Sequence, residues 1–305
     1  MHQSVLLAEV ITALQPHSGG IYMDGTVGAG GHTAALLAAS APDGQVFGFD
    51  RDQSALDLAK RQLAQFGQRV HLFHANFDRL AQTARAHNLP PADGILLDLG
   101  VSSMQFDQPE RGFSFQAEGP LDMRMDASAG PTAAELVNSL PEEELANLIY
   151  RYGEERHSRR IARAIVKARP LSSTAELAQL VLRASRSERT KIHPATRTFQ
   201  ALRIAVNDEL GALERTLPQA LACLNPGGRL AVISFHSLED RIVKNYFRQE
   251  SQDCICPPEQ PVCTCRHKAT IDIITKRPIT ASLVEIDANP RARSAKLRVV
   301  ELKRM

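Results

Sequence analysis

The chain has 305 residues, of which 43% are hydrophobic and 23% charged, and its formal net charge is +2 at pH 7. This composition is typical of a globular protein long enough for two domains or for one domain with an insertion. No apolar run approaches the roughly twenty residues that a membrane span needs, and the N-terminus lacks the basic segment and cleavage site of a secretory signal. We therefore expect a cytoplasmic protein.

A glycine-rich turn follows the first predicted strand. Residues 1–20 have the apolar spacing of a helix, and residues 21–39 predict a buried strand, a turn containing Gly28, Gly30 and Gly31, and a second helix. Glycines permit positive φ and let a ligand approach the main chain, and the next helix offers free N–H groups. The turn favours a nucleotide-like ligand; the alternative is an ordinary strand-to-helix turn.

An acid ends the second predicted strand, residues 45–50. Asp50 lies twenty residues after Gly30, where such βαβ units hold ribose hydroxyls. Asp52 is the alternative, although it falls past the strand end. The glycine spacing is not G-x-G-x-x-G, so S-adenosylmethionine, which has no pyrophosphate, fits better than NAD. Asp24 could face its charged amino acid end.

Four ligand-capable residues fall at or just past predicted strand ends. Residues 54–66 predict a helix, 70–74 a third strand and 94–98 a fourth, and this alternation indicates a parallel sheet with covered faces. Ligands of open parallel sheets bind outside the carboxyl ends of the strands. The residues at those ends are Asp24, Asp50, Phe77 and Asp98.

The regular pattern stops after Ser103. Residues 105–125 predict a long loop, whose apolar side chains favour an ordered structure. Residues 132–205 are helical in pattern, with Ser139 and Ser173 as helix starts, because each is followed three residues later by glutamate. We predict a first part of the sheet domain over 1–125, an inserted all-helical domain over 126–205, and a second part over 206–305.

The helical insertion is dense in arginine. Such a run is commonly a solvated face, and the alternative is a surface that contacts RNA phosphates without reading the sequence. The residues concerned are Arg151, Arg156, Arg159, Arg160, Arg163, Arg183, Arg186, Arg189, Arg197 and Arg203.

The sheet pattern resumes after the insertion. Residues 217–224 predict a helix, 225–228 a turn, 229–235 a fifth strand, and the segment after His236 another helix. Residues 271–275 and 296–302 predict two last strands without a long crossover, which suits an antiparallel edge. The fold class is therefore α/β, a Rossmann-like sheet with an inserted all-helical domain, and its antiparallel edge is similar to that of class I methyltransferase sheets.

Four of the five cysteines form two C-x-C pairs separated by six residues: Cys254, Cys256, Cys263 and Cys265. Four thiolates can bind zinc tetrahedrally, and cysteine pairs in a cytosolic protein favour metal over disulfide. The alternative is a loop with reduced thiols. The fifth, Cys223, is expected in the core.

Long motifs across essentially the whole chain resemble one known family. Residues 24–32, 97–103, 111–115, 119–125, 193–200, 233–241 and 289–294 are together similar to the bacterial ribosomal RNA small subunit methyltransferase H family, also called MraW. The resemblance implies methylation of N4 of cytidine 1402 in 16S rRNA of the small subunit, with S-adenosylmethionine. It also implies cofactor contacts at Gly30, Gly31, His32, Asp50, Phe77, Asp98 and Gln105; His32 and Gln105 come from the resemblance alone.

The group that faces the target amino group stays open. The chain has Asp98-Leu99-Gly100-Val101 where many amino methyltransferases have [D/N/S]-P-P-[Y/F], so we assign Asp98 to the cofactor and take Asp122 and His236 as catalytic candidates. Two alternatives are a non-catalytic assembly factor, which the intact glycines and Asp50 oppose, and a small-molecule methyltransferase, which the arginine-rich insertion opposes. The oligomeric state is undetermined, a dimer being one alternative.

Overall fold

The computed structural model describes residues 4–185, 193–257, 259–260 and 262–304. The chain divides into two compact units, the first comprising residues 1–100 with 210–305 and the second residues 101–209. Among the described helices, none is long and apolar enough to cross a membrane.

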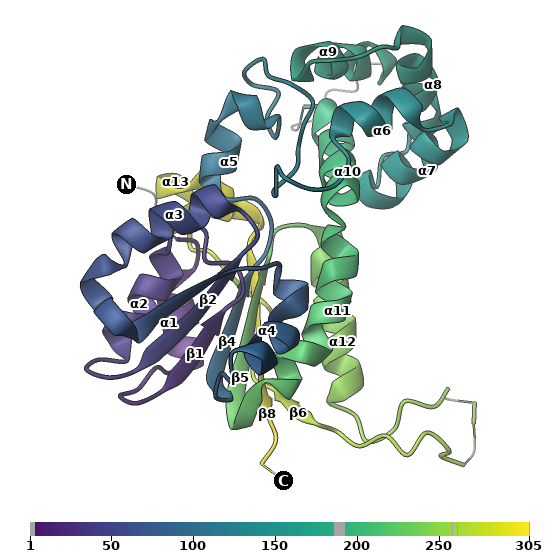
Figure 1. Cartoon of the computed structure of the whole chain (residues 1–305). Coiled ribbons are helices and arrows are strands. Elements are labelled where there is room, and N and C mark those ends of the chain that lie inside the picture. The colour runs from purple at the N-terminus through teal and green to yellow at the C-terminus, as the bar shows by residue number, and fades with distance from the viewer. Residues whose placement is uncertain (1–3, 186–192, 258, 261, 305) are drawn as a thin grey trace. The chain divides into compact units, whose positions relative to one another are not determined.

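The first unit is built on one eight-stranded sheet with the strand order β3-β2-β1-β4-β5-β8-β6, and β7 pairs with β8 (Figure 1). Strands β1 to β5 pair in parallel, whereas β8 is antiparallel to β5, β6 and β7. The Rossmann-like α/β sheet with an antiparallel edge, predicted from sequence, is therefore confirmed. The strands are β1 (Ile21–Asp24), β2 (Gln45–Asp50), β3 (Val70–His74), β4 (Ala92–Asp98), β5 (Leu224–Ser234), β6 (Ile271–Ile273), β7 (Ile279–Thr280) and β8 (Lys296–Leu302).

Helices cover both faces of this sheet, because successive strand residues point to opposite sides. Tyr22 joins one buried core and its neighbour Met23 joins the other. The first core lies under α1 (Leu7–Leu14), α2 (Gly31–Ala39) and α3 (Gln53–Gln62). The second lies under α4 (Leu80–Ala86), α11 (Glu209–Ala222) and α12 (Ser237–Glu250).

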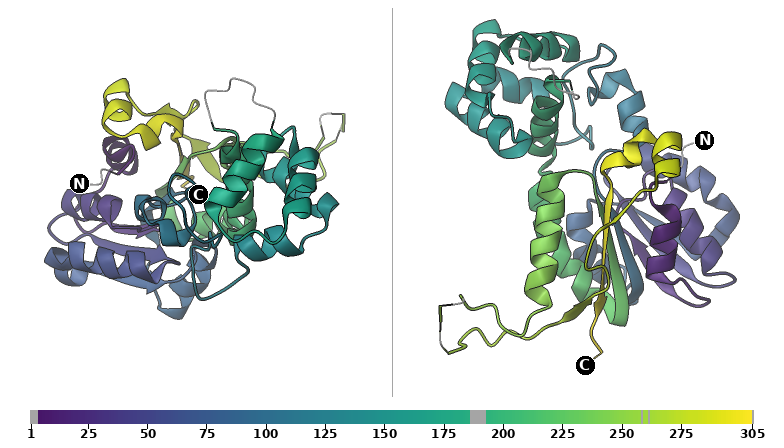
Figure 2. Two further views of the ribbon diagram at one scale, coloured as in Figure 1. Left: turned by 90° about the horizontal axis from the view of Figure 1, so that it is seen from above. Right: turned by 180° about the vertical axis from the view of Figure 1, so that it is seen from behind.

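Short elements complete the first unit. Near the C-terminus, α13 lies beside the N-terminal helix (Figure 2), where the Leu6 N–H donates to Glu285 Oε1 at 2.7 Å. These elements are α13 (Leu283–Ala288), η1 (Ala64–Arg69), η2 (Phe77–Arg79) and η4 (Pro290–Ser294).

The second unit is helical in residues 126–205 as far as they are described, as predicted. Ser173 caps α9 through a capping box, but Ser139 does not begin a helix: it ends α6, and α7 starts after Pro141. The elements of this unit are α5 (Ser103–Asp107), η3 (Pro109–Arg111), α6 (Ala133–Ser139), α7 (Glu142–Gly153), α8 (Ser158–Ala168), α9 (Thr174–Ala184) and α10 (Ala195–Asn207).

Segment 101–125, which the sequence assigned to the sheet domain, instead belongs to the helical unit. Its buried side chains Phe113, Leu121, Met123 and Met125 pack in the same core as the helices. The boundary expected at 125 thus lies inside the second unit, because these apolar side chains are covered there. The second boundary, expected at 205, follows Glu209.

Candidate functional site

The carboxyl ends of the parallel strands bring the predicted ligand residues of the first unit to one edge. Asp24, Asp50 and Asp98 are the last residues of β1, β2 and β4, and Phe77 begins η2 just beyond β3. A Cβ placed on Gly25 would lie 3.3 Å from Phe77 Cβ, so Phe77 borders the turn that follows β1. The convergence expected from sequence is therefore present.

The glycine turn has the backbone that its sequence predicts. Gly28 has φ +53° and Gly30 has φ +92°, both in the left-handed region, and Gly30 is the N-cap of α2. A Cβ on Gly30 would press on Leu63 at 3.2 Å, and one on Gly31 would collide with the Ser4 hydroxyl. Glycine is therefore required at both positions, because Leu63 and Ser4 occupy the space that a side chain would need.

Asp24 stabilises this turn through hydrogen bonds to residues on both sides of the glycines. Its side chain is fully buried, and it accepts hydrogen bonds from the Thr26 N–H at 3.1 Å and from Thr33 Oγ1 at 2.6 Å. Burial raises the pKa of this carboxyl, and the hydrogen bond from Thr33 opposes the rise. Asp24 supports the turn through these hydrogen bonds, and its contact with a ligand stays a prediction.

Asp50 connects β2 to the glycine turn. Its Oδ2 accepts from the Gly28 N–H and its Oδ1 from the Asp52 N–H, both at 2.8 Å. Burial raises the pKa of Asp50 to about 6, although both hydrogen bonds act to lower it. The rival Asp52 is the N-cap of α3, accepting from the Ser54 N–H at 3.0 Å, and is 4% exposed. Of the two acids, Asp50 is thus better placed to accept hydrogen bonds from a ribose.

The buried His32 and the half-buried Asp98 form a polar pair. His32 Nε2 lies 3.5 Å from Asp98 Oδ2, and the histidine is 5% exposed. Burial acts to lower the pKa of His32, but the nearby Asp98 and Asp24 carboxylates outweigh it and raise the pKa. Among the described residues, Asp98 Oδ1 has no hydrogen-bond partner, whereas Asp98 Oδ2 faces His32.

Asn76, which follows β3 by two residues, adds another unpartnered group. Its Oδ1 is buried without a hydrogen-bond partner in the described part of the chain. Sequence reasoning missed its role, and its place directly before Phe77 at a strand end is the signal that could have found it. An unpaired buried polar atom costs about 1–3 kcal/mol, so this set of atoms fits a polar ligand with several donors.

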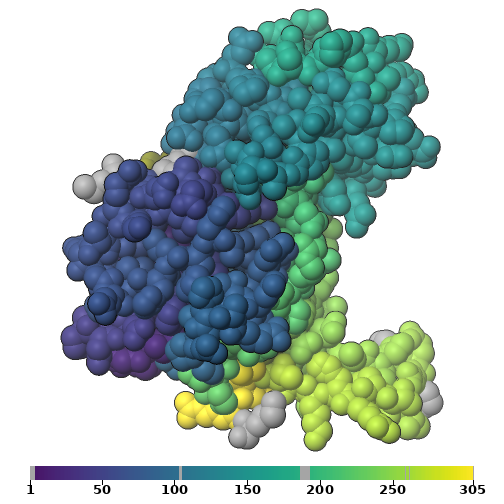
Figure 3. Space-filling view, viewed as in Figure 1, coloured from purple at the N-terminus to yellow at the C-terminus, as the bar shows by residue number. Residues whose placement is uncertain are grey.

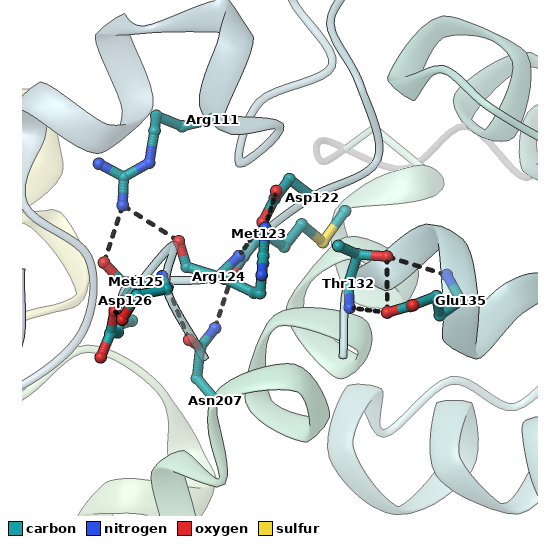
Figure 4. Close-up of polar contacts among 10 residues, drawn as sticks. Arg111, Asp122, Met123, Arg124, Met125, Asp126, Thr132, Glu135 and Asn207 are labelled. Atoms are coloured by element: carbon teal, nitrogen blue, oxygen red, sulfur yellow. Dashed lines mark hydrogen bonds and ion pairs between the residues drawn. The ribbon is translucent and has the colours of Figure 1, made fainter. Parts of the chain in front are cut away.

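Two predicted residues belong to the second unit. Gln105 is 5% exposed and forms a capping box with Ser102, whose N–H donates to Gln105 Oε1 at 3.1 Å. Asp122 makes a two-point ion pair with Arg124, with distances of 2.9 and 2.8 Å (Figure 4). Burial acts to raise the pKa of Asp122, but the hydrogen bonds from Arg124 lower it.

Polar side chains order the segment around Asp122, as predicted for an ordered loop. The Arg111 guanidinium donates to the carbonyls of Arg124 and Met125, and Asn207 bonds to the main chain of Met123 and Met125 (Figure 4). The segment therefore has a fixed backbone although it contains little regular structure.

His236 lies just beyond the end of β5, the strand next to β4. It is the N-cap of α12, and its Nδ1 accepts from the Glu239 N–H at 3.4 Å. Its Nε2 lies 3.3 Å from Glu239 Oε1. The Glu239 carboxylate also accepts from the Phe235 N–H at 2.9 Å. His236 thus has a structural task whether or not it contacts a substrate.

The four clustered cysteines converge in the first unit. Their sulfur atoms all lie within 4.8 Å of one another. The N–H groups of Ile255 and His267 donate to Cys265 Sγ and lower the pKa of that thiol to about 6. Cys223 is half-buried and packs against the sheet core, as expected.

The arginines of the insertion differ in exposure. Arg159 and Arg163 are exposed on α8, whereas Arg203 is 14% exposed and forms a two-point ion pair with Glu209 at 2.8 and 2.9 Å. Arg203 is therefore not part of a solvated face. Arg186 and Arg189 lie outside the described residues.

Comparison with known proteins agrees with these features. The chain is 55% identical over 304 residues to a ribosomal RNA small subunit methyltransferase H of Syntrophotalea carbinolica, covering 98% of this chain and 97% of that protein. Proteins of the same name from Citrifermentans bemidjiense and Heliobacterium mobile are 54% and 52% identical, each with 98% of both chains covered. The model of the MraW methylase family matches residues 1–303. With this match along nearly its whole length, the chain belongs to the MraW methylase family.

Proposed function

We propose that this methyltransferase transfers a methyl group from S-adenosylmethionine to N4 of cytidine 1402 in 16S rRNA, within the small ribosomal subunit of the cytoplasm. The observation that carries the proposal is the strand edge of the first unit, where Asn76 Oδ1 and Asp98 Oδ1 are buried polar atoms without partners among the described residues. Relatives more than 50% identical are named for the small subunit rRNA, which supports this choice of substrate.

The residues at this edge fit the cofactor. Asp50 would accept from the ribose hydroxyls, because each of its oxygens has a lone pair beyond those used by Gly28 and Asp52. Gly30 and Gly31 would contact the cofactor at the start of α2, as in the family, and Phe77 would offer an apolar ring surface. His32 and Asp98 would bond to its polar groups, and Gln105 stays a prediction from the family.

S-adenosylmethionine supplies a methyl group made electrophilic by a sulfonium. On the substrate side, a nitrogen–carbon bond forms at N4 and a proton leaves that nitrogen, so the chain must orient the amino group and accept a hydrogen bond from it. Asp122 and His236 are the proposed partners. Asp122 would accept through the lone pairs that its hydrogen bonds from Arg124 leave free. The target base has to leave any stack, at a cost of about a few kcal/mol.

Helix α8 offers a surface for the RNA backbone. Arg159, Arg163 and Lys167 are spaced four residues apart, so they lie on one face, and all three are exposed. Such guanidinium and ammonium groups bind phosphates in a sequence-independent way.

The test is incubation of the purified protein with labelled S-adenosylmethionine and small subunits from a strain that lacks the modification. We expect label in N4-methylcytidine at position 1402, identified by nuclease digestion and mass spectrometry. Asp50→Ala and Asp98→Ala should each weaken cofactor binding by roughly ten- to a hundredfold, because a hydrogen bond to a charged group contributes about 1.5–3 kcal/mol.

The matched control is Asp43→Ala. Asp43 is an exposed carboxylate in the same unit, but it lies between α2 and β2, at the amino ends of the strands, and bonds to Ser18 and Gly19. The Asp43→Ala variant should methylate as the parent chain does. Label in another nucleotide would contradict the proposed position, and cofactor binding without transfer to any subunit would favour an assembly factor.

A further inference from the structure

Residues 251–269 form an arm that joins α12 to β6. Its base is closed by the Thr270 N–H, which donates to the Glu250 carbonyl at 2.8 Å, and by the Ala269 N–H, which donates to Asp253 Oδ1 at 3.2 Å. Figure 1 shows the yellow-green arm extending beyond α12 and β6, and Figure 3 shows the same arm in space-filling form. None of its described residues is buried. So short a segment cannot build a hydrophobic core, and such segments commonly need a cross-link or a metal.

The arm has two halves, one with Cys254 and Cys256 and the other with Cys263 and Cys265, and the cysteines lie where these halves meet. Cys263 Sγ lies 3.6 Å from Cys265 Sγ, and Cys265 Sγ lies 3.9 Å from Cys254 Sγ. Sulfur atoms at the corners of a regular tetrahedron around zinc, with zinc–sulfur bonds of about 2.3 Å, would be about 3.8 Å apart. A disulfide would need about 2.05 Å, and all four cysteines are free thiols.

The surroundings of the sulfur atoms suit thiolate ligands. The N–H groups of Ile255 and His267 both donate to Cys265 Sγ at 3.5 Å. His267 Nε2 in turn lies 3.7 Å from Glu250 Oε1, which ties the second half of the arm to the end of α12. Outer contacts of this kind orient metal ligands.

We propose that Cys254, Cys256, Cys263 and Cys265 bind one structural zinc ion that joins the two halves of the arm. Four soft sulfur ligands in a tetrahedron fill the coordination sphere of zinc and leave no position for a substrate or water. The ion therefore has no part in methyl transfer, and its role is to hold the arm in one conformation. This inference is independent of which nucleotide the enzyme methylates.

The test begins with the zinc content of the full chain, purified without a polyhistidine tag under reducing conditions and measured by plasma mass spectrometry. We expect one zinc per chain in the parent protein and none in the Cys256→Ser/Cys263→Ser variant, which loses one ligand from each pair. The matched control, Cys223→Ser, removes the cysteine outside the cluster and should keep the metal. S-adenosylmethionine binding by each variant reports whether the sheet unit is folded.

A second measurement does not depend on variants. Cobalt(II) added to the metal-free parent chain should saturate at one equivalent, with the ligand-field bands of a tetrahedral tetrathiolate site. Removal of zinc by a chelator should speed trypsin cleavage after the exposed Arg266 and Lys268, which lie in the arm. A parent chain that takes up neither zinc nor cobalt, zinc that persists in the double variant, or alkylation masses that reveal disulfides would each overturn the proposal.

Discussion

At the scale of single residues, the ionisation state of Asp50 affects both the glycine turn and the proposed cofactor contact. Its ionised form accepts from two main-chain N–H groups and, as proposed, from the cofactor ribose. Because its pKa is raised to about 6, a fraction of Asp50 is protonated just below neutral pH. A protonated carboxyl has less acceptor capacity for hydroxyl donors.

We therefore expect the affinity for S-adenosylmethionine to fall as the pH falls through about 6, by up to about tenfold per pH unit below it. Calorimetric titration between about pH 5 and pH 8 measures this dependence. Asp50→Asn should bind more weakly and should lose this inflection, although His32, whose pKa is also raised, can leave a smaller one. An inflection unchanged in Asp50→Asn would assign the effect to another group.

The raised pKa of Asp50 changes the stability of the fold with pH in the direction opposite to its effect on cofactor affinity. Between about pH 4 and pH 6 the folded chain binds more protons at Asp50 than the unfolded chain does, since the carboxyl of an unfolded chain titrates near pH 4. The contribution of Asp50 to the free energy of unfolding therefore decreases as the pH rises through this window. Binding and stability measurements thus separate the role of Asp50 toward the cofactor from its role in the fold.

The sequence identified the acids at the strand ends but did not show how far each one is buried. Strand and acid patterns place Asp24, Asp50 and Asp98 at one edge, and the structure agrees. That Asp24 is buried under Thr26 and Thr33, whereas Asp98 keeps an oxygen unpartnered among the described residues, depends on the path of the turn between them. No periodicity in a single sequence records that path.

At the scale of elements, one catalytic candidate, His236, also caps a helix, so its structural role must be separated from any catalytic role. His236 caps α12, so its replacement by alanine should cost about 1 kcal/mol of unfolding free energy whatever its catalytic role. Asparagine is itself a good N-cap, so His236→Asn should retain the thermal stability. If the imidazole contacts the substrate, kcat should still fall strongly in His236→Asn. Equal stability with unchanged kcat would limit His236 to capping.

Helix α8 carries the prediction for RNA. The Arg159→Ala/Lys167→Ala variant removes two exposed cations from one face, and each cation that binds a phosphate contributes about 0.7–0.9 to the slope of log affinity against log salt. We therefore expect a shallower slope in this variant, measured by filter binding to deproteinised 16S rRNA across a salt series. The control is Lys60→Ala/Arg61→Ala, an exposed cation pair on α3. Equal slopes in both double variants would exclude α8 from the RNA interface.

Short elements were where sequence prediction failed. Helix α5 spans only residues 103–107 and β7 only two residues, too few for a periodic pattern. Ser139 has the spacing of a helix start but stands at the end of α6, where its Oγ donates to the Glu135 carbonyl at 2.6 Å. The spacing of a serine and a glutamate does not show whether the serine ends one helix or begins the next. Here α7 begins after Pro141, so Ser139 belongs to α6.

At the scale of the whole molecule, the alternation of strands and helices was enough to predict the sheet and the insertion. The boundary near 125 was misplaced because Phe113, Leu121 and Met123 can cover either a sheet or a helical core, and only the structure assigns them to the latter. The convergence of the two cysteine pairs likewise depends on the hydrogen bonds that close the arm. Composition and spacing describe such segments without describing what they pack against.

The two units have separate hydrophobic cores, which leads to a last prediction. A ligand stabilises the part of a chain whose folding its binding requires, by about 2.7 kcal/mol at a concentration one hundred times its Kd. Amides of β1, β2 and β4 that exchange only by unfolding of the sheet unit should therefore exchange about a hundredfold more slowly with S-adenosylmethionine. Amides in α7, α8 and α9 should be unaffected, and Asp50→Ala at the same ligand concentration should show little change anywhere. Hydrogen exchange followed by mass spectrometry measures both units in one experiment. Equal slowing in α7 to α9 would mean that cofactor binding requires the second unit as well, either because the two cores unfold as one cooperative structure or because Gln105 contacts the cofactor. Slowing that persists in α7 to α9 of a Gln105→Ala variant would leave the cooperative structure as the explanation.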